Sequence, residues 1–90
     1  MVIVQADAFD AIDSVTVVLF TTEKHVGILP RLAVIPDVEN GLAVESQLMV
    51  DKITTAQRTS LGKRVGRLSD SDMDRLEAAV LVFLGMGRRA

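Results

Sequence analysis

The sequence predicts a mainly β domain: a small, strongly bent sheet or partial barrel, plugged by one helix at the C-terminal end. Short runs rich in β-branched residues recur from the first residue to about residue 68, and a sustained helical period begins only after residue 69. A length of 90 residues suits one small domain. We therefore expect a single domain over residues 1–90, with five short strands and one helix.

The strand pattern is strongest at residues 15–22, where β-branched or large apolar residues follow one another without interruption. We expect this strand to be central and covered on both sides. The hydroxyls of Thr21 and Thr22 fall at its end, where they either cap the exposed ladder or contact a substrate. A turn at Asn40-Gly41 precedes the next long strand. The weaker strands are expected at residues 1–5, 31–36, 47–57 and 63–68.

The helix has recognisable start and stop signals. Ser69 is the expected N-cap, with Asp72 three residues later in a shortened capping box and further acids in the first turns. Gly85 is expected to end the helix as the residue after its C-cap. Between them, one apolar face is predicted. Its members are Met73, Leu76, Val80, Phe83 and Leu84.

Composition excludes several kinds of site. The chain has no Cys and a single His, His25, so we expect no disulfide, no metal centre and no cofactor. The longest apolar run is too short to span a membrane and no secretory signal is visible, which predicts a cytoplasmic protein without membrane association. A hydrophobic content of 49% in so short a chain predicts that some apolar surface meets a second subunit, in a homodimer.

The charge is small overall but unevenly distributed. The net charge is −2, and the only aromatic residues are three Phe, which argues against general nucleic-acid binding and against aromatic base-stacking platforms. From Lys52 to Ser69, however, five cations occur with no acid, directly after Asp51. A strand with one carboxylate beside a cationic ribbon is compatible with phosphate chemistry, and equally with an ordinary solvated hairpin. The five cations are Lys52, Arg58, Lys63, Arg64 and Arg67.

Over residues 2–84 the chain resembles the MazF/PemK (Kid) toxin family, which is related in structure to CcdB. The segments that carry the resemblance, in family order, are VIVQADAF, VTVVLFTT, ENGLAVESQLMVDKITT, LGKRVGRLSDSDM and VFLG. The resemblance implies an SH3-like small barrel with a C-terminal helix. It also implies a homodimeric, metal-independent endoribonuclease that cuts single-stranded RNA through the 2′-OH. Such a toxin inhibits growth, and a cognate antitoxin neutralises it by lying over the RNA groove and binds DNA with it.

The resemblance also assigns roles to residues. Thr21 matches the family's Thr that holds the scissile phosphate, and Asp51 matches the Asp that serves as general base on the 2′-OH, so both are expected in one groove. Lys24, Lys52 and Arg58 are the candidate RNA-binding cations. Two further catalytic residues of the family have no match in this chain. One is an Arg whose position is taken by Met49, and the other is the Arg of an upstream Arg-Pro pair.

That Arg-Pro pair follows an N-terminal strand and loop that have no counterpart here, so we expect a family member whose N-terminus is short and whose cleavage is slow. Thr21 and Asp51 supply no positive charge for the developing phosphorane, and loss of one such electrostatic partner costs about 3–4 kcal/mol. One alternative is a catalytically weak or inactive short homologue that serves as an antitoxin-binding module. Another is a gyrase poison like CcdB, which the absence of a C-terminal Trp makes the last choice.

Overall fold

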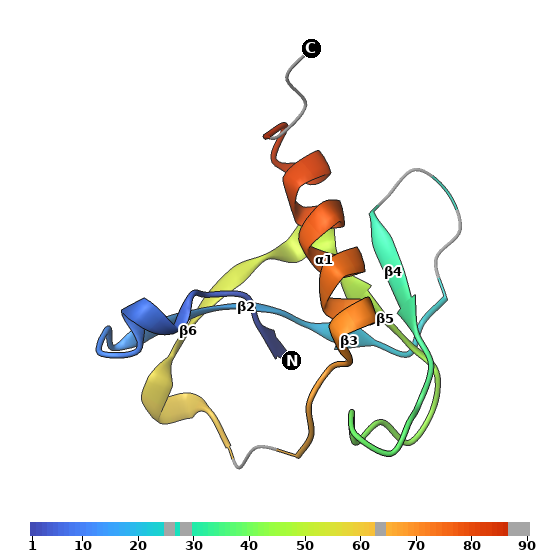
Figure 1. Ribbon diagram of the computed structural model, residues 1–90, viewed down its shortest axis with the longest axis horizontal. Helices are drawn as coiled ribbons and strands as arrows, with labels where there is room; N and C mark the ends of the chain where they lie inside the picture. The colour runs from blue at the N-terminus through green and yellow to red at the C-terminus, as the bar shows by residue number, and fades with distance from the viewer. Residues whose placement is uncertain (25–26, 28–29, 63–64, 87–90) are drawn as a thin grey trace.

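The computed structural model describes residues 1–24, 27, 30–62 and 65–86. Within these residues lie six short strands, three 3-10 turns and one α-helix (Figure 1). The predicted class, mainly β with one C-terminal helix, is confirmed. The strands are β1 (Val2–Ile3), β2 (Ser14–Val18), β3 (Phe20–Thr21), β4 (Arg31–Val34), β5 (Ser46–Met49) and β6 (Thr54–Gln57), and the helix is α1 (Asp70–Phe83).

The strands form two antiparallel three-stranded sheets, in the orders β1-β2-β6 and β3-β5-β4. The chain passes from one sheet to the other twice, at Leu19 between β2 and β3 and at a 3-10 turn, Val50–Lys52, between β5 and β6. The structure thus has two sheets joined at these two crossings, and they do not close into a barrel over the described residues.

Three strand predictions need correction. Residues 15–22 and 47–57 are each two strands in different sheets, because the chain bends where it changes sheet: the second run turns at Asp51 while the neighbouring Val50 is fully buried. The third, at residues 63–68, is wrong for its described part, 65–68, which forms no strand. There the backbone crosses the turn at Asn40 instead, and Arg67 N donates to Glu39 O at 2.6 Å.

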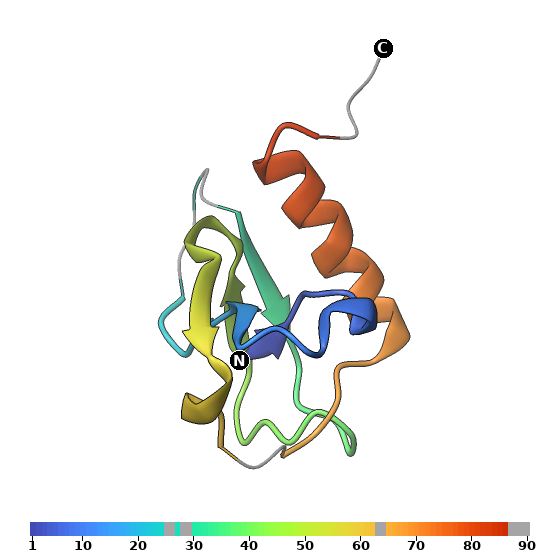
Figure 2. The same ribbon diagram turned by 90° about the vertical axis from the view of Figure 1, so that its left-hand side faces the viewer.

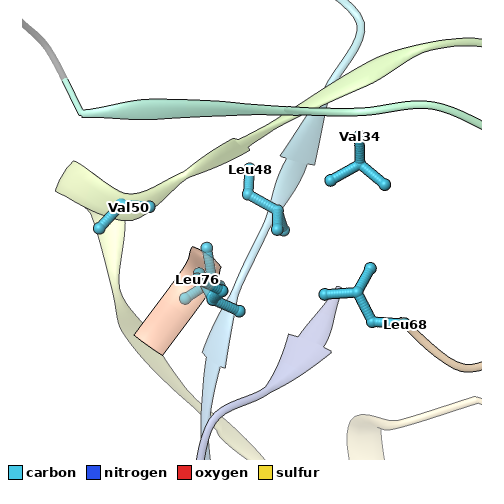
Figure 3. Packing of buried hydrophobic residues seen from close by; sticks show 6 residues of the cluster. Val34, Leu48, Val50, Leu68 and Leu76 are labelled. Carbon is cyan, nitrogen blue, oxygen red and sulfur yellow. The ribbon is translucent and has the colours of Figure 1, made fainter. Parts of the chain in front are cut away.

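The hydrophobic core lies between the bent sheet and the helix. Figure 3 shows aliphatic side chains from β4, β5, the following 3-10 turn and α1 pointing toward one another. Burying such side chains is the main stabilising term available to a chain without disulfides. The buried members are Val18, Val34, Leu48, Val50, Leu68 and Leu76.

The helix begins and ends where the sequence indicates. The Ser69 hydroxyl accepts from Asp72 N at 3.1 Å, and Gly85 adopts the left-handed conformation, with φ of 71°. The predicted apolar face is only partly right: Leu76 is fully buried, but Phe83 and Leu84 are exposed. The reason is visible in Figure 1, where the C-terminal end of α1 projects beyond the strands.

Candidate active site on the outer face of the β3-β5-β4 sheet

The β3-β5-β4 sheet has one face toward the core and one face away from it. Leu48 of β5 is fully buried on the core side, and α1 packs on that side as well (Figure 2). Because side chains alternate along a strand and direct cross-strand partners share a face, the opposite face carries three pairs, one of which joins Ala33 of β4 to Gln47 of β5. Thr21 of β3 is paired with Gln47 of β5, and Arg31 of β4 is paired with Met49 of β5. We call this surface the outer face.

An ion pair lies at the end of the outer face where β5 turns. The Arg31 guanidinium donates from Nε to Asp51 Oδ1 at 2.7 Å and from Nη2 to Asp51 Oδ2 at 3.2 Å. Their side chains are only 11% and 12% exposed, so the pair is partly screened from water. Two parallel bonds fix the orientation of both planar groups, which a single contact does not.

The pairing shifts both titrations. The hydrogen bond from Arg31 lowers the pKa of Asp51, desolvation opposes this, and the positive charges of Arg31 and Lys52 lower it further. The hydrogen bond to Asp51 raises the pKa of Arg31, and the charge of Glu23 adds to the effect. Asp51 is consequently an ionised carboxylate at neutral pH. It is in the protonation state that a general base needs, although a low pKa makes it a weak one.

Thr21 closes the other end of the outer face. Its hydroxyl accepts from Glu23 N at 3.2 Å, which shapes the turn that follows β3. No hydrogen bond between described residues joins Thr21 to Asp51. Glu23, two residues after Thr21, adds its charge to the raised pKa of Arg31, the partner of Asp51. The sharing of one groove by Thr21 and Asp51 stays a prediction that this common face supports.

The predicted RNA-binding cations lie in different places. Lys52 is exposed in the 3-10 turn next to Asp51, and Lys24 is exposed in the loop that follows Thr21. Arg58 is separated from Asp51 by the whole of β6, and its Nε donates to the Ile12 carbonyl at 3.0 Å. Arg58 thus ties the end of β6 to the loop before β2. His25, Lys63 and Arg64 lie outside the described residues.

Sequence reasoning missed Arg31. It opens β4, and its side chain meets a carboxylate 20 residues away because β4 and β5 pair with Arg31 opposite Met49. The available signal was an Arg at the first position of a strand-like run, in a half of the chain that contains only two bases.

Two further features bear on what the site can bind. Among the described residues no cluster of three His, Cys, Asp or Glu is placed to hold a metal ion. A mainly apolar hollow of about 600 Å³ lies beside β1, and neither Arg31 nor Asp51 lines it. Its lining includes Ile3, Phe20, Leu42 and Met73. Asn40 and Arg67 also line the hollow, but the ion pair of the outer face lies outside it.

The geometry defines a small β protein with a hydroxyl and a cation on one face of a sheet and an ionised carboxylate in the turn at its end. Residues 1–84 match the family model described as PemK-like, MazF-like toxin of type II toxin-antitoxin system. The chain belongs to this family of toxins.

Similar proteins agree with this assignment. Over 86 residues the chain is 50% identical to a Mycolicibacterium smegmatis protein named "Probable endoribonuclease MazF", covering 96% of this chain and 79% of that protein. The solved Mycobacterium tuberculosis toxin MazF-mt6 is 25% identical with a TM-score of 0.80, covering 93% of this chain and 83% of that one. A mycobacterial endoribonuclease solved with its cognate antitoxin is 22% identical, a level that bears on the fold alone, with a TM-score of 0.81 over 97% and 81% of the two chains.

A separate finding concerns membranes. Within the described ranges, the structure contains no helix with the length and apolar character needed to cross a bilayer.

Proposed function

We propose that this toxin is an endoribonuclease that cuts single-stranded RNA through the 2′-OH, without a metal. The observation that carries the proposal is the 50% identity to a protein named as a probable endoribonuclease, over nearly the whole chain. The outer face adds chemical support, because a hydroxyl, an ionised carboxylate and a guanidinium gather there. These are the groups that phosphodiester cleavage by an internal hydroxyl uses.

In the proposed reaction, Asp51 accepts the proton of the 2′-OH as its oxygen attacks phosphorus. The bond between O2′ and phosphorus forms, the bond between phosphorus and O5′ breaks, and O5′ takes a proton from water. The products are a 2′,3′-cyclic phosphate and a 5′-hydroxyl end. Thr21 donates a hydrogen bond from its hydroxyl to a non-bridging phosphoryl oxygen, while its oxygen accepts from Glu23 N.

The test uses the purified 90-residue chain and one long unstructured RNA in the presence of a chelator. We expect cleavage at defined sites, cyclic phosphate ends, and no cleavage where the attacking nucleotide is 2′-deoxy. Asp51→Asn should lose about a hundredfold or more in rate. Cleavage that requires a metal, or that continues at 2′-deoxy sites, would contradict the mechanism. A chain that binds a cognate antitoxin but cuts no RNA would instead be the antitoxin-binding module.

We also propose that the antitoxin covers the outer face. Family membership makes this chain the toxin of a toxin–antitoxin pair, and an acidic or extended partner segment would meet there a sheet surface with exposed Lys24 three residues after Thr21 and exposed Lys52 next to Asp51. An antitoxin peptide bound there excludes RNA, so the two ligands should compete in an anisotropy titration. Simultaneous, independent binding of both would contradict the shared surface.

Finally, we propose a homodimer in which the exposed end of α1 is buried. Four consecutive large apolar residues there remain exposed, with Val82 at 73%. Soluble monomers rarely leave such contiguous apolar surface uncovered. The four are Leu81, Val82, Phe83 and Leu84.

A further inference from the structure

We propose that Arg31 is a catalytic residue, which contacts the scissile phosphate and stabilises the negative charge of the phosphorane. This inference rests on the proposed ribonuclease function and deepens it. The reaction requires a cation, and the inference identifies it as a residue on β4. This strand lies outside the segments around Thr21 and Asp51 from which the site was predicted.

The first argument is one of charge. As phosphorus becomes five-coordinate its non-bridging oxygens gain negative charge, and preorganised cations or N–H donors are the usual source of stabilisation. Thr21 and Asp51 provide no positive charge. Lys24 and Lys52 are exposed, so water screens their charges and their flexible stems are not fixed. Arg31 is a cation on the outer face that is both partly screened from water and held in one orientation.

The second argument is geometric. Arg31 uses Nε and Nη2 to bind Asp51, so its ion pair occupies one edge of the guanidinium. Nη1 makes no hydrogen bond to any described residue. Arg has five N–H donors in a planar fork, which matches phosphate as well as carboxylate. A phosphate that approaches the Nη1 side therefore meets donors already aimed by Asp51.

The third argument concerns the base. A guanidinium that binds Asp51 and phosphate together places the two substrate groups that react, the 2′-OH and its neighbouring phosphate, at adjacent positions. Phosphate at Arg31 also brings a negative charge toward Asp51, which raises the affinity of the carboxylate for a proton. The cation that makes Asp51 a weak base in the free protein thus becomes shared with the substrate when RNA binds.

The experiment compares cleavage with binding. Cleavage sites are first mapped with the wild-type chain, and an RNA with 2′-deoxy at the attacking nucleotide then serves as an uncleavable ligand for affinities at several salt concentrations. The variants are Arg31→Gln, Arg31→Lys, Asp51→Asn and the double variant Arg31→Gln/Asp51→Asn. Arg75→Gln is the matched control, because Arg75 also pairs with an Asp, at 2.9 Å, but on α1, where the Arg75 side chain is 48% exposed and its other hydrogen bond goes to the Ala33 carbonyl.

We expect Arg31→Gln to cut at least about a hundredfold more slowly. It should also bind the uncleavable RNA more weakly, with a slope of log affinity against log salt that is smaller by about 0.7, the value for one lost phosphate contact on a single strand. Arg31→Lys should restore the slope and part of the rate. Asp51→Asn should lose cleavage but bind as tightly as wild type or tighter, because a negative charge beside the phosphate is removed. Arg75→Gln should match wild type.

The double variant separates a phosphate contact from a merely structural role. If Arg31 only orients Asp51, the double variant will have the same salt slope as Asp51→Asn, and the inference is overturned. A lower slope in the double variant supports the contact, and a urea unfolding transition of the double variant that matches that of Asp51→Asn excludes misfolding as the cause. Failure of the wild-type chain to cut any RNA would overturn the proposed function, whereas wild-type cleavage with an unchanged Arg31→Gln would overturn this inference alone.

Discussion

Gly66 lies so close to Asn40 that a Cβ atom added at Gly66 would come within 2.5 Å of the Asn40 carbonyl carbon and would also clash with Glu39 O. The Asn40 side chain holds the same turn from the inside: Nδ2 donates to Ile35 O at 2.9 Å, and Oδ1 accepts from Asp37 N and from Leu42 N. This close approach of Gly66 to Asn40 joins the segment before α1 to the turn between β4 and β5. It therefore helps to fix the sheet that carries the candidate site.

Gly66→Ala should therefore destabilise the protein strongly, because both close atoms belong to backbone that has to move. We expect a loss of at least about 2 kcal/mol in the free energy of unfolding, in the range of overpacked interiors. Gly62→Ala is the matched control, since a Cβ there meets nothing within 4 Å, and it should change stability by less than about 1 kcal/mol. The measurement is urea unfolding of both variants. Equal midpoints for the two would show that this close approach is not rigid.

The acid stability of the protein should depend on Asp51. Arg31 lowers the pKa of this carboxyl in the folded protein, so folding favours its ionised form. The resulting stabilisation is present above the ordinary Asp pKa of about 3.9 and is lost as the pH falls toward the lower pKa of the folded state. Wild type should thus be more stable than Asp51→Asn at pH 6, and the difference should shrink progressively below about pH 4.

Unfolding in urea at pH values from 3 to 7 checks this, with Asp70→Asn as control. Asp70 also pairs with an Arg, at 3.3 Å, but both side chains are largely exposed and water screens them. A difference between wild type and Asp51→Asn that does not vary with pH would show that the ion pair does not perturb the titration of Asp51.

Local signals in the sequence predicted local structure well. Ser69 and Gly85 mark the ends of α1 because capping depends on residues within one turn of the helix. Four of the five predicted runs contain strands, and the run at residues 63–68 forms none in its described part. The breaks at Leu19 and Asp51 were missed, because each break is imposed by a change of sheet and no Gly or Pro marks it.

The site was predicted only in part for a related reason. Thr21 and Asp51 were found through resemblance to a family, but Arg31 reaches Asp51 only because β4 and β5 pair in one register. A shift of one residue would turn Arg31 toward the core side. Pairing over such a distance in sequence depends on the whole sheet, and no local pattern in the chain specifies it.

The cap of α1 gives a simple stability test. Ser69→Ala removes the acceptor for Asp72 N and should cost about 1 kcal/mol in the free energy of unfolding. Ser71→Ala, two residues later and exposed within the helix, is the control and should be neutral or slightly stabilising, since Ala is the better helix former. Thermal unfolding of both variants measures the difference. A Ser69→Ala variant as stable as Ser71→Ala would indicate that water replaces the cap at no cost.

The last prediction concerns the proposed homodimer and the exposed end of α1. Val82 is 73% exposed on a helix end where its neighbours Leu81 and Phe83 are also exposed, at 45% and 44%. If a second copy covers this end, Val82→Lys places a charge in an apolar interface, which is strongly unfavourable because a buried charge lacks its hydration. Sedimentation equilibrium at micromolar concentration should show a dimer for wild type and a monomer for Val82→Lys. Val38→Lys makes the same chemical change at a valine that is 102% exposed in the turn between β4 and β5, and it should remain dimeric.

Because the helix end projects beyond the strands, Val82→Lys should retain the unfolding cooperativity of a folded domain, so loss of the dimer can be told from loss of the fold. A wild-type chain that sediments as a monomer would contradict the homodimer, and a dimeric Val82→Lys would place the interface on another surface.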